Sequence, residues 1–320
     1  MSHQQHAASP GPEGFRPAEG GNPGVGRIRN YISLLRPYQW VKNTLLFLPL
    51  LLAHEVLSFH RGGGVFLAMV CFSLAASSVY VLNDFTDVEA DRLHPRKCRR
   101  PIASGAVPRS HAPGLALFLA AAALAGAWAW LPNPFVAVLA GYLVANLAYS
   151  FWCKHVPVLD VVVLTQMYVV RIVAGGVAAG VEVTDWLLGF SLFQFLSIAF
   201  AKRYAELREA REAGGSDGES VRGYRLNDLD MVGVLGVSSG MLASLVLAMY
   251  IRSPDVLALY ASPKILWLVC AALIYWTGRI WMLAGRGEMS DDPVRFALRD
   301  RVSYWTLLFM VAVTLAAKGL

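Results

Sequence analysis

Charged side chains are scarce in this 320-residue sequence: 16% of the residues are Asp, Glu, Lys or Arg, whereas 56% are hydrophobic. Soluble domains carry about 25% charged residues, so this deficit argues against a soluble fold. The mean hydropathy of +0.48 agrees. The net charge of +6 is concentrated in short segments between apolar runs. That pattern is typical of loops on one side of a membrane and not of a nucleic-acid-binding protein.

Cysteine is also scarce, and the four cysteines show no CxxC spacing: Cys71, Cys98, Cys153 and Cys270. We therefore expect neither disulfides nor a zinc site. The histidines lack the spacing of metal ligands, and no Ser-His-Asp or Cys-His arrangement is present. These absences argue against zinc chemistry and against nucleophilic catalysis by a serine or cysteine.

Long apolar runs fill the rest of the sequence. Residues 1–26 are rich in Gly, Pro, Ser, Gln and His, lack the features of a signal peptide, and are predicted to be a disordered tail. Residues 27–320 contain nine apolar runs, each long enough to cross a bilayer: 41–58, 64–83, 113–131, 134–151, 158–180, 184–203, 231–251, 264–284 and 302–319. We therefore predict an all-α integral membrane protein, a single bundle of about nine transmembrane helices.

Basic residues indicate an orientation. Lysines and arginines concentrate before the first run and after the second, fourth, sixth and eighth runs. The positive-inside rule then places the N-terminus and these loops in the cytoplasm. The charged, Gly- and Ser-rich segment 207–228 is expected to be mobile.

An acidic motif ends the second run, in the sequence VLNDFTDVEADR. On a helix, four oxygen-bearing side chains share one arc of roughly 100°: Asn83, Asp84, Asp87 and Asp91. Glu89 points the other way. Three carboxylates and an amide oxygen on one face suit a hard divalent cation, Mg²⁺ in particular. The alternative is a polar helix end at the membrane surface.

A basic loop follows this motif, in RLHPRKCRRPIASG. Its prolines break helix continuity, so we expect a loop over the cytoplasmic mouth of the bundle. Cations beside carboxylates suit a metal-bridged polyphosphate, with Mg²⁺ on the acids and residues such as Arg100 on the remaining oxygens. Cations that only determine topology are the alternative.

At the cytoplasmic ends of other apolar runs, three segments carry polar residues that are candidates for the site. RPYQWVKN contributes Lys42 and Asn43, YSFWCKHVPVLD contributes Tyr149, Lys154 and Asp160, and AKRYAE contributes Lys202 and Arg203. Interfacial anchoring and snorkelling are the alternative roles for the cations.

Arg171 lies eleven residues beyond Asp160, near the same helical angle and about 16 Å deeper. An arginine at that depth is costly unless it faces the bundle interior. It is either a counter-ion to Asp160 or a partner for a ligand's phosphate.

The motif NDxxDxxxD at the end of the second of nine predicted helices resembles that of the UbiA superfamily of intramembrane prenyltransferases. RPxQWxKN, RPIASG, YSxxxKH and RxxAGG are similar to segments of its decaprenyl-phosphate phosphoribosyltransferase branch. The resemblance covers the chain from about residue 28.

The resemblance implies Mg²⁺-dependent transfer of 5-phosphoribosyl from phosphoribosyl diphosphate to a polyprenyl (decaprenyl) phosphate, with release of diphosphate. The setting would be cell-wall polysaccharide precursor synthesis in a bacterial inner (plasma) membrane, with the active site toward the cytoplasm and oligomeric state left open. Asp84, Asp87 and Asp91 would be catalytic and would bind the metal with Asn83. The substrate-binding candidates are Lys42, Asn43, Asn83, Arg100, Tyr149, Lys154, Asp160, Arg171, Lys202 and Arg203.

Two alternatives remain. Aromatic prenyltransferases of the superfamily usually carry a second DxxxD motif after the fifth helix, and this sequence lacks one, since Glu182 and Asp185 lie at the opposite membrane face in the predicted topology. That absence disfavours an isoprenyl diphosphate donor with an aromatic or other acceptor. A lipid or metal transporter is the other alternative, and polar residues gathered at one face disfavour it.

Overall fold

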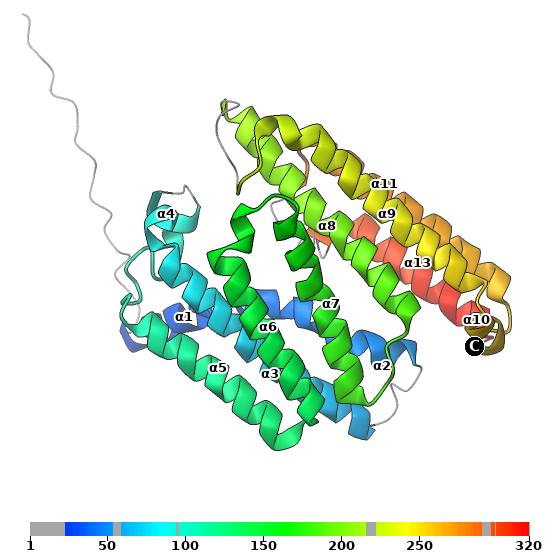
Figure 1. The fold of residues 1–320 in the computed structure, drawn as a ribbon, viewed down its shortest axis with the longest axis horizontal. Coiled ribbons are helices and arrows are strands. Elements are labelled where there is room, and N and C mark those ends of the chain that lie inside the picture. The colour runs from blue at the N-terminus through cyan, green and yellow to red at the C-terminus, as the bar shows by residue number, and fades with distance from the viewer. Residues whose placement is uncertain are drawn as a thin grey trace, which may run out of the picture.

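The computed structural model describes residues 23–53, 59–93, 96–215, 222–289, 296–297 and 299–319, which form an all-helical bundle (Figure 1). In chain order its helices are α1 (Pro23–Leu34), η1 (Pro37–Phe47), α2 (Leu48–Leu52), α3 (Phe59–Thr86), α4 (Val88–Leu93), η2 (Lys97–Arg99), α5 (His111–Trp130), α6 (Asn133–Phe151), η3 (Cys153–His155), α7 (Leu159–Ala179), α8 (Asp185–Glu212), η4 (Leu226–Asp228), α9 (Leu229–Ile251), α10 (Pro254–Leu259), η5 (Pro263–Leu266), α11 (Trp267–Arg286) and α13 (Arg301–Lys318). The η elements are 3₁₀ helices.

Six helical segments in the described part of the chain are long and apolar enough to cross a membrane. They are Arg61–Thr86, His111–Trp130, Asn133–Phe151, Leu159–Ala179, Leu226–Ile251 and Pro263–Arg286. They correspond to predicted runs two, three, four, five, seven and eight. Runs six and nine largely coincide with parts of α8 and α13, which are continuous helices but are not among these six segments. The all-α membrane architecture is therefore confirmed, and the count of nine crossings is not.

The first predicted run is not one transmembrane helix in the described residues. Its first part is the 3₁₀ helix η1, and the five-residue α2 follows with Pro49 in its first turn. Proline lacks the N–H that would continue the preceding helix, which explains the division at this point. At the N-terminus, α1 begins at Pro23, inside the predicted tail. Residues 1–22 of that tail lie outside the described part.

Close packing of small residues sets the positions of the helices around the polar end. A Cβ on Gly175 of α7 would overlap the backbone of Leu46 in η1, and a Cβ on Gly236 of α9 would overlap the ring of Trp281 in α11. Small residues at such crossings are typical of membrane helices. The contact at Gly175 brings η1, which carries two predicted site residues, directly against α7.

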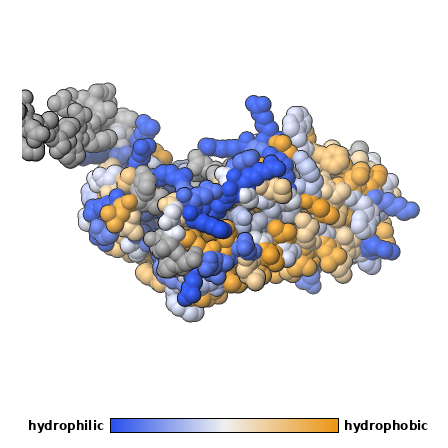
Figure 2. Space-filling view, turned by 90° about the horizontal axis from the view of Figure 1, so that it is seen from above, coloured by the Kyte–Doolittle hydropathy of each residue, from blue (hydrophilic) through white to orange (hydrophobic). Residues whose placement is uncertain are grey.

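Polar side chains gather at one end of the bundle. Figure 1 shows α4, the turn between α6 and α7, and the connection from α8 to α9 at the same end of the molecule. Viewed from that side, hydrophilic residues lie over the middle of the face and hydrophobic residues lie beside them (Figure 2). Large apolar side chains such as Trp128 and Trp305 are 77% and 69% exposed, as lipid-facing positions require. All four cysteines are free.

Candidate active site

The acidic motif spans the junction of two helices. α3 ends at Thr86 and α4 begins at Val88, with Asp87 in the turn between them. The sequence predicts one helical face, and the structure interrupts it at Asp87. The helical spacing persists, because the N–H of Asp87 donates to the carbonyl of Asn83 at 2.9 Å and that of Asp91 to the carbonyl of Asp87 at 2.8 Å.

The predicted division of the acids into two faces is confirmed. Asp84 and Asp91 are buried. The side chain of Glu89 is 71% exposed and lies 3.4 Å from both Arg92 and Arg109. Glu89 is therefore part of a solvated surface network, separate from the other acids.

Arginines hold the two buried carboxylates. Arg36, at the start of η1, pairs with Oδ1 of Asp84. Nη1 of Arg100 lies 3.2 Å from the same oxygen and 2.6 Å from Oδ2 of Asp91. Arg100 thus bridges two acids seven positions apart in the sequence. The other oxygen of Asp84, Oδ2, is buried and has no hydrogen-bond partner.

The third carboxylate has its own cation. Nζ of Lys154, in η3 between α6 and α7, lies 3.2 Å from Oδ1 of Asp87. Their side chains are 18% and 39% exposed, so this pair lies at the mouth of the site. The structure thereby unites the acidic motif with two predicted phosphate-binding residues, Arg100 and Lys154. Arg36 begins the segment RPYQWVKN, and no signal in the sequence pairs it with Asp84.

The donor set suits a hard cation, although the side chains are arranged as ion pairs. Among the described residues, no group of three or more His, Cys, Asp or Glu side chains is arranged to hold a metal ion. Arg100 lies between Asp84 and Asp91, and Asp87 faces Lys154. Oδ2 of Asp84 is a buried carboxylate oxygen with no hydrogen-bond partner, so no hydrogen bond offsets the cost of removing it from water. Carboxylate oxygens are the ligands that Mg²⁺ prefers, so the residues fit such an ion if Arg100 turns aside.

A second polar group centres on Arg171 of α7, which is buried. Its guanidinium donates to Oδ1 of Asn43 at 2.8 Å, to the hydroxyl of Tyr142 at 3.0 Å and to the carbonyl of Met167. Asn43 in turn donates to Ser73 at 2.9 Å. The alternative of a counter-ion to Asp160 is therefore wrong, because Arg171 holds η1 to α6 and α7 instead.

A third polar group contains Asp160 and Arg203. The two side chains are fully buried and lie 2.7 Å apart, joining α7 to α8. The hydroxyl of Tyr224 donates to the other carboxylate oxygen of Asp160 at 2.7 Å. Arg203 also pairs with Glu206, and Tyr149 lies within electrostatic range of Arg203. The arrangement is an internal brace between helices.

Ionisation in this third group follows from the same contacts. Burial and the hydrogen bond to Asp160 raise the pKa of the Tyr224 hydroxyl. Burial alone would raise the pKa of Glu206, but the neighbouring Arg203 and Lys202 hold it below its ordinary value. Tyr224 thus stays a neutral donor and Glu206 an anion near neutral pH. Tyr224 was missed because composition predicts mobility for 207–228, whereas its side chain is only 2% exposed; residues 216–221 of that segment lie outside the described part.

Lys42 lies at an apolar cavity of about 190 Å³ between η1, α7, α8 and α11. Tyr168, Phe195 and Trp276 contribute to its wall, and the ammonium of Lys42 lies 5.9 Å from the Tyr168 ring centroid. Lys202 of α8 is close enough to interact with both Lys42 and Glu206. A cation beside an apolar cavity suits the phosphate end of a lipid.

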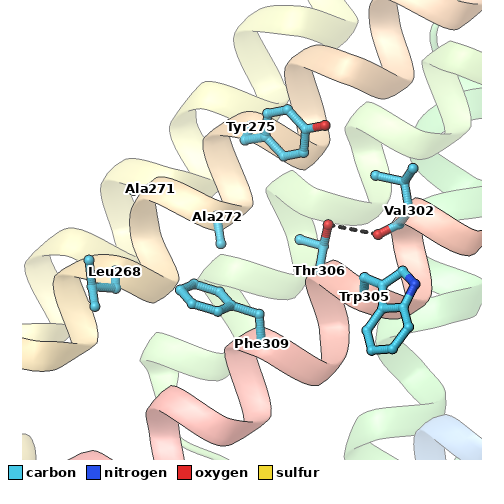
Figure 3. A pocket seen from close by; sticks show the side chains of 8 residues that line it. All are labelled: Leu268, Ala271, Ala272, Tyr275, Val302, Trp305, Thr306 and Phe309. Carbon is cyan, nitrogen blue, oxygen red and sulfur yellow. Dashed lines mark hydrogen bonds between the residues drawn. The ribbon is translucent and has the colours of Figure 1, made fainter.

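A larger groove of about 450 Å³ lies between α11 and α13 (Figure 3). Its wall is formed by Leu268, Ala271, Ala272, Tyr275, Val302, Trp305, Thr306 and Phe309. The hydroxyl of Thr306 donates to the carbonyl of Val302 at 2.8 Å, which leaves the lining almost wholly apolar. None of these residues belongs to the acidic motif or to its cations.

The chain is similar to known proteins over most of its length. Residues 44–308 match the model of the UbiA prenyltransferase family. A decaprenyl-phosphate phosphoribosyltransferase of Mycolicibacterium smegmatis is 36% identical, with 89% of this chain and 92% of that protein covered. An uncharacterized protein of Sinorhizobium fredii is 35% identical over 87% of this chain, which spans only 54% of that protein. The structure of a UbiA homolog from Archaeoglobus fulgidus bound to DMAPP and Mg²⁺ has the same fold, with a TM-score of 0.65 at 17% identity, and 89% of this chain and 98% of that chain are covered. The chain therefore belongs to the UbiA prenyltransferase family and is a transferase.

Proposed function

We propose that this transferase moves a 5-phosphoribosyl group from phosphoribosyl diphosphate to a polyprenyl phosphate, with release of diphosphate. The observation that carries the proposal is the alternation of acids and cations at the polar end, where Arg100 bridges Asp84 and Asp91 and Lys154 meets Asp87. Carboxylates for a metal and cations for phosphate oxygens are the two parts of a diphosphate site. The 36% identity to a decaprenyl-phosphate phosphoribosyltransferase supports the choice of donor and acceptor.

Asp84, Asp87 and Asp91, with Asn83 beside them, would hold Mg²⁺. Bound there, Mg²⁺ would offset the negative charge that develops on the departing diphosphate. Arg36, Arg100 and Lys154 now neutralise these carboxylates. With a metal ion on the carboxylates, the same three cations would be available to bind phosphate oxygens of the donor.

The reaction needs no strong general base. The bond between C1 of ribose and the diphosphate oxygen breaks, and the diphosphate leaves with the electron pair. A phosphate oxygen of the lipid, already ionised at neutral pH, forms the new bond to C1. This balance agrees with the lack of a histidine or serine arrangement in the sequence.

The acceptor lipid would lie beside η1. Lys42 and Lys202 would bind its phosphate, and the first part of its chain would lie along the apolar cavity lined by Tyr168, Phe195 and Trp276. Arg171 and Asn43 would fix η1 against α7. Asp160 and Arg203 would brace α7 against α8, with Tyr149 close by. These residues would therefore contribute to substrate binding by fixing the positions of η1, α7 and α8, and not by contacting the substrate.

The setting that we propose is a bacterial plasma membrane, with the polar end and its diphosphate site in the cytoplasm. Phosphoribosyl diphosphate is water-soluble and would reach the site from that side. The basic loops around the polar end support this orientation by the positive-inside rule. The lipid product would then serve as a precursor for cell-wall polysaccharide.

The deciding experiment supplies membranes containing the protein with labelled phosphoribosyl diphosphate and decaprenyl phosphate, and measures the mass of the lipid product. We expect a Mg²⁺-dependent lipid that has gained one phosphoribosyl group. Membranes with the Asp87→Ala variant are the control and should form this lipid roughly 100- to 1,000-fold more slowly.

An isoprenyl diphosphate donor is the second candidate. The apolar cavity beside Lys42 would accept the chain of an isoprenyl diphosphate donor as well as that of a polyprenyl phosphate acceptor. This observation favours the isoprenyl donor as the alternative. Consumption of isoprenyl diphosphate alone in the same membranes would overturn the phosphoribosyl proposal.

A further inference from the structure

The turn that precedes α7 is backbone-strained at Val158. This residue has φ +67°, in the left-handed region, which a β-branched side chain adopts at a cost. The N–H of Val158 donates to the hydroxyl of Tyr224 at 2.7 Å. A distant residue therefore holds the strained turn in place.

Tyr224 is itself fixed by the brace between α7 and α8. Its hydroxyl donates to Asp160 at 2.7 Å, and Asp160 pairs with Arg203 at 2.7 Å. The guanidinium of Arg203 lies 6.0 Å from the centroid of the Tyr224 ring. One phenol oxygen thus accepts from the backbone before α7 and donates to the first turn of α7.

Gly223 packs against the residues just before Val158. Its φ is +85°, and a Cβ at this position would overlap the carbonyl oxygen of His155 and approach Cδ of Pro157 to 3.0 Å. Glycine is the residue that permits both the backbone conformation and the close approach. Residues 223–224 therefore cover the connection from η3 to α7 along its length.

Lys154 lies in η3, directly before this connection. η3 is only three residues long, and its end is tied by the bond from the N–H of Val156 to the carbonyl of Cys153 at 3.1 Å. Nζ of Lys154 lies 3.2 Å from Oδ1 of Asp87. A shift of the connection would move this cation directly.

We propose that Gly223 and Tyr224 form a positioning strap that holds the connection between α6 and α7, so that Lys154 lies against Asp87. The contacts of Gly223 and Tyr224 given above are with this connection and with Asp160, so both residues act on the site through Lys154. The inference rests on the proposed function only in assigning Lys154 to a diphosphate. Misplacement of a binding group by about 1 Å can lower a rate about 100-fold, so loss of the strap should lower turnover.

A double-mutant cycle between Tyr224→Phe and Lys154→Met tests the strap. Tyr224→Phe removes one hydroxyl and should lower kcat/KM about tenfold, through a raised KM for the diphosphate donor and an unchanged KM for the lipid. In the Lys154→Met background the same change should add less than about twofold, because the residue it positions is absent. Tyr275→Phe, in the groove of Figure 3, is the matched control and should be neutral. Additive effects of the two substitutions would overturn the proposal.

A second readout does not depend on the reaction. Hydrogen exchange of the full-length protein should show faster exchange in residues 152–162 of Tyr224→Phe, by about tenfold, and no change in α5. Gly223→Ala, which leaves the Tyr224 hydroxyl in place, should loosen the same peptide. Unchanged hydrogen exchange in both variants would refute the proposed strap. If wild-type protein fails to use phosphoribosyl diphosphate but exchange changes as expected, the proposed function fails and the strap stands.

Discussion

Replacing Asp87 with alanine separates chemistry from folding better than any other change in the acidic motif. The Asp87 side chain is 39% exposed and has one ion-pair partner, Lys154. Exposed pairs of this kind stabilise a protein by about 0–1 kcal/mol. Asp84 is different: it is 2% exposed and holds both Arg36 and Arg100. Its loss would remove the carboxylate shared by Arg36 and Arg100, whose side chains are 16% and 27% exposed, and should destabilise the fold more than the loss of Asp87.

The expected effect of Asp87→Ala on turnover is large. Under the proposed function this carboxylate binds the metal that stabilises the leaving diphosphate. Removing one preorganised electrostatic contact to a transition state costs about 2.7–4 kcal/mol, or roughly 100- to 1,000-fold in rate. The melting temperature should fall by no more than about 2–4 °C. Purified protein, labelled phosphoribosyl diphosphate and a Mg²⁺ titration measure the first quantity, and a thermal melt measures the second.

Glu89→Ala is the matched control, because Glu89 lies two positions away on the opposite face. Its side chain is 71% exposed, and its partners Arg92 and Arg109 are surface residues. We expect turnover within about twofold of wild type, since surface pairs contribute little. Wild-type Mg²⁺-dependent turnover in Asp87→Ala would refute the metal assignment. Equal losses in both variants would refute the division of the motif into two faces.

Three further predictions follow from the other polar groups. Arg171→Met should lower the melting temperature strongly, because Oδ1 of the buried Asn43 and the hydroxyl of Tyr142 lose the guanidinium that donates to them, at about 1–3 kcal/mol each. A melting temperature within about 2 °C of wild type would contradict this role. Arg203→Leu should lower the free energy of unfolding by about 3–5 kcal/mol, because Asp160 loses its buried cation. Adding Asp160→Leu should recover part of this loss, as denaturation of both variants would show. A chelator should stop lipid product formation, and added Mg²⁺ should restore it and raise the melting temperature of the protein; full activity after exhaustive chelation would exclude a required metal.

Local periodicity explains which parts of the site were predictable from the sequence. The burial of Asp84 and Asp91 and the exposure of Glu89 follow from helical spacing within eight residues, and the turn at Asp87 changes this little. The apolar runs likewise predict the long helices, since composition alone determines which segments can enter a membrane. The first run fails because Pro49 ends the 3₁₀ segment, which a hydropathy average does not register.

Contacts between distant segments were not predictable by the same means. Helical angle placed Asp160 and Arg171 on one face of α7, which made them plausible partners. Asp160 instead pairs with Arg203 of α8 and accepts a hydrogen bond from Tyr224, which lies 64 residues further along the chain. Arg171 donates to Asn43 of η1, to Tyr142 of α6 and to the carbonyl of Met167. Composition predicted a mobile segment around Tyr224 because glycine and charge are frequent there. One buried phenol and one glycine at positive φ are enough to fix its end.

The ion pairs of the acidic motif also explain why charge pattern and metal chemistry lead to the same residues. Three carboxylates, Asp84, Asp87 and Asp91, need three positive charges in a low-dielectric site, and Arg36, Arg100 and Lys154 supply them. A divalent cation that arrives with a diphosphate would satisfy both sets at once, the metal on the carboxylates and the cations on the phosphate oxygens. A divalent cation alone would have to displace Arg100 and leave it unpaired. Under the proposed function, metal and donor should therefore bind cooperatively, each raising the affinity for the other.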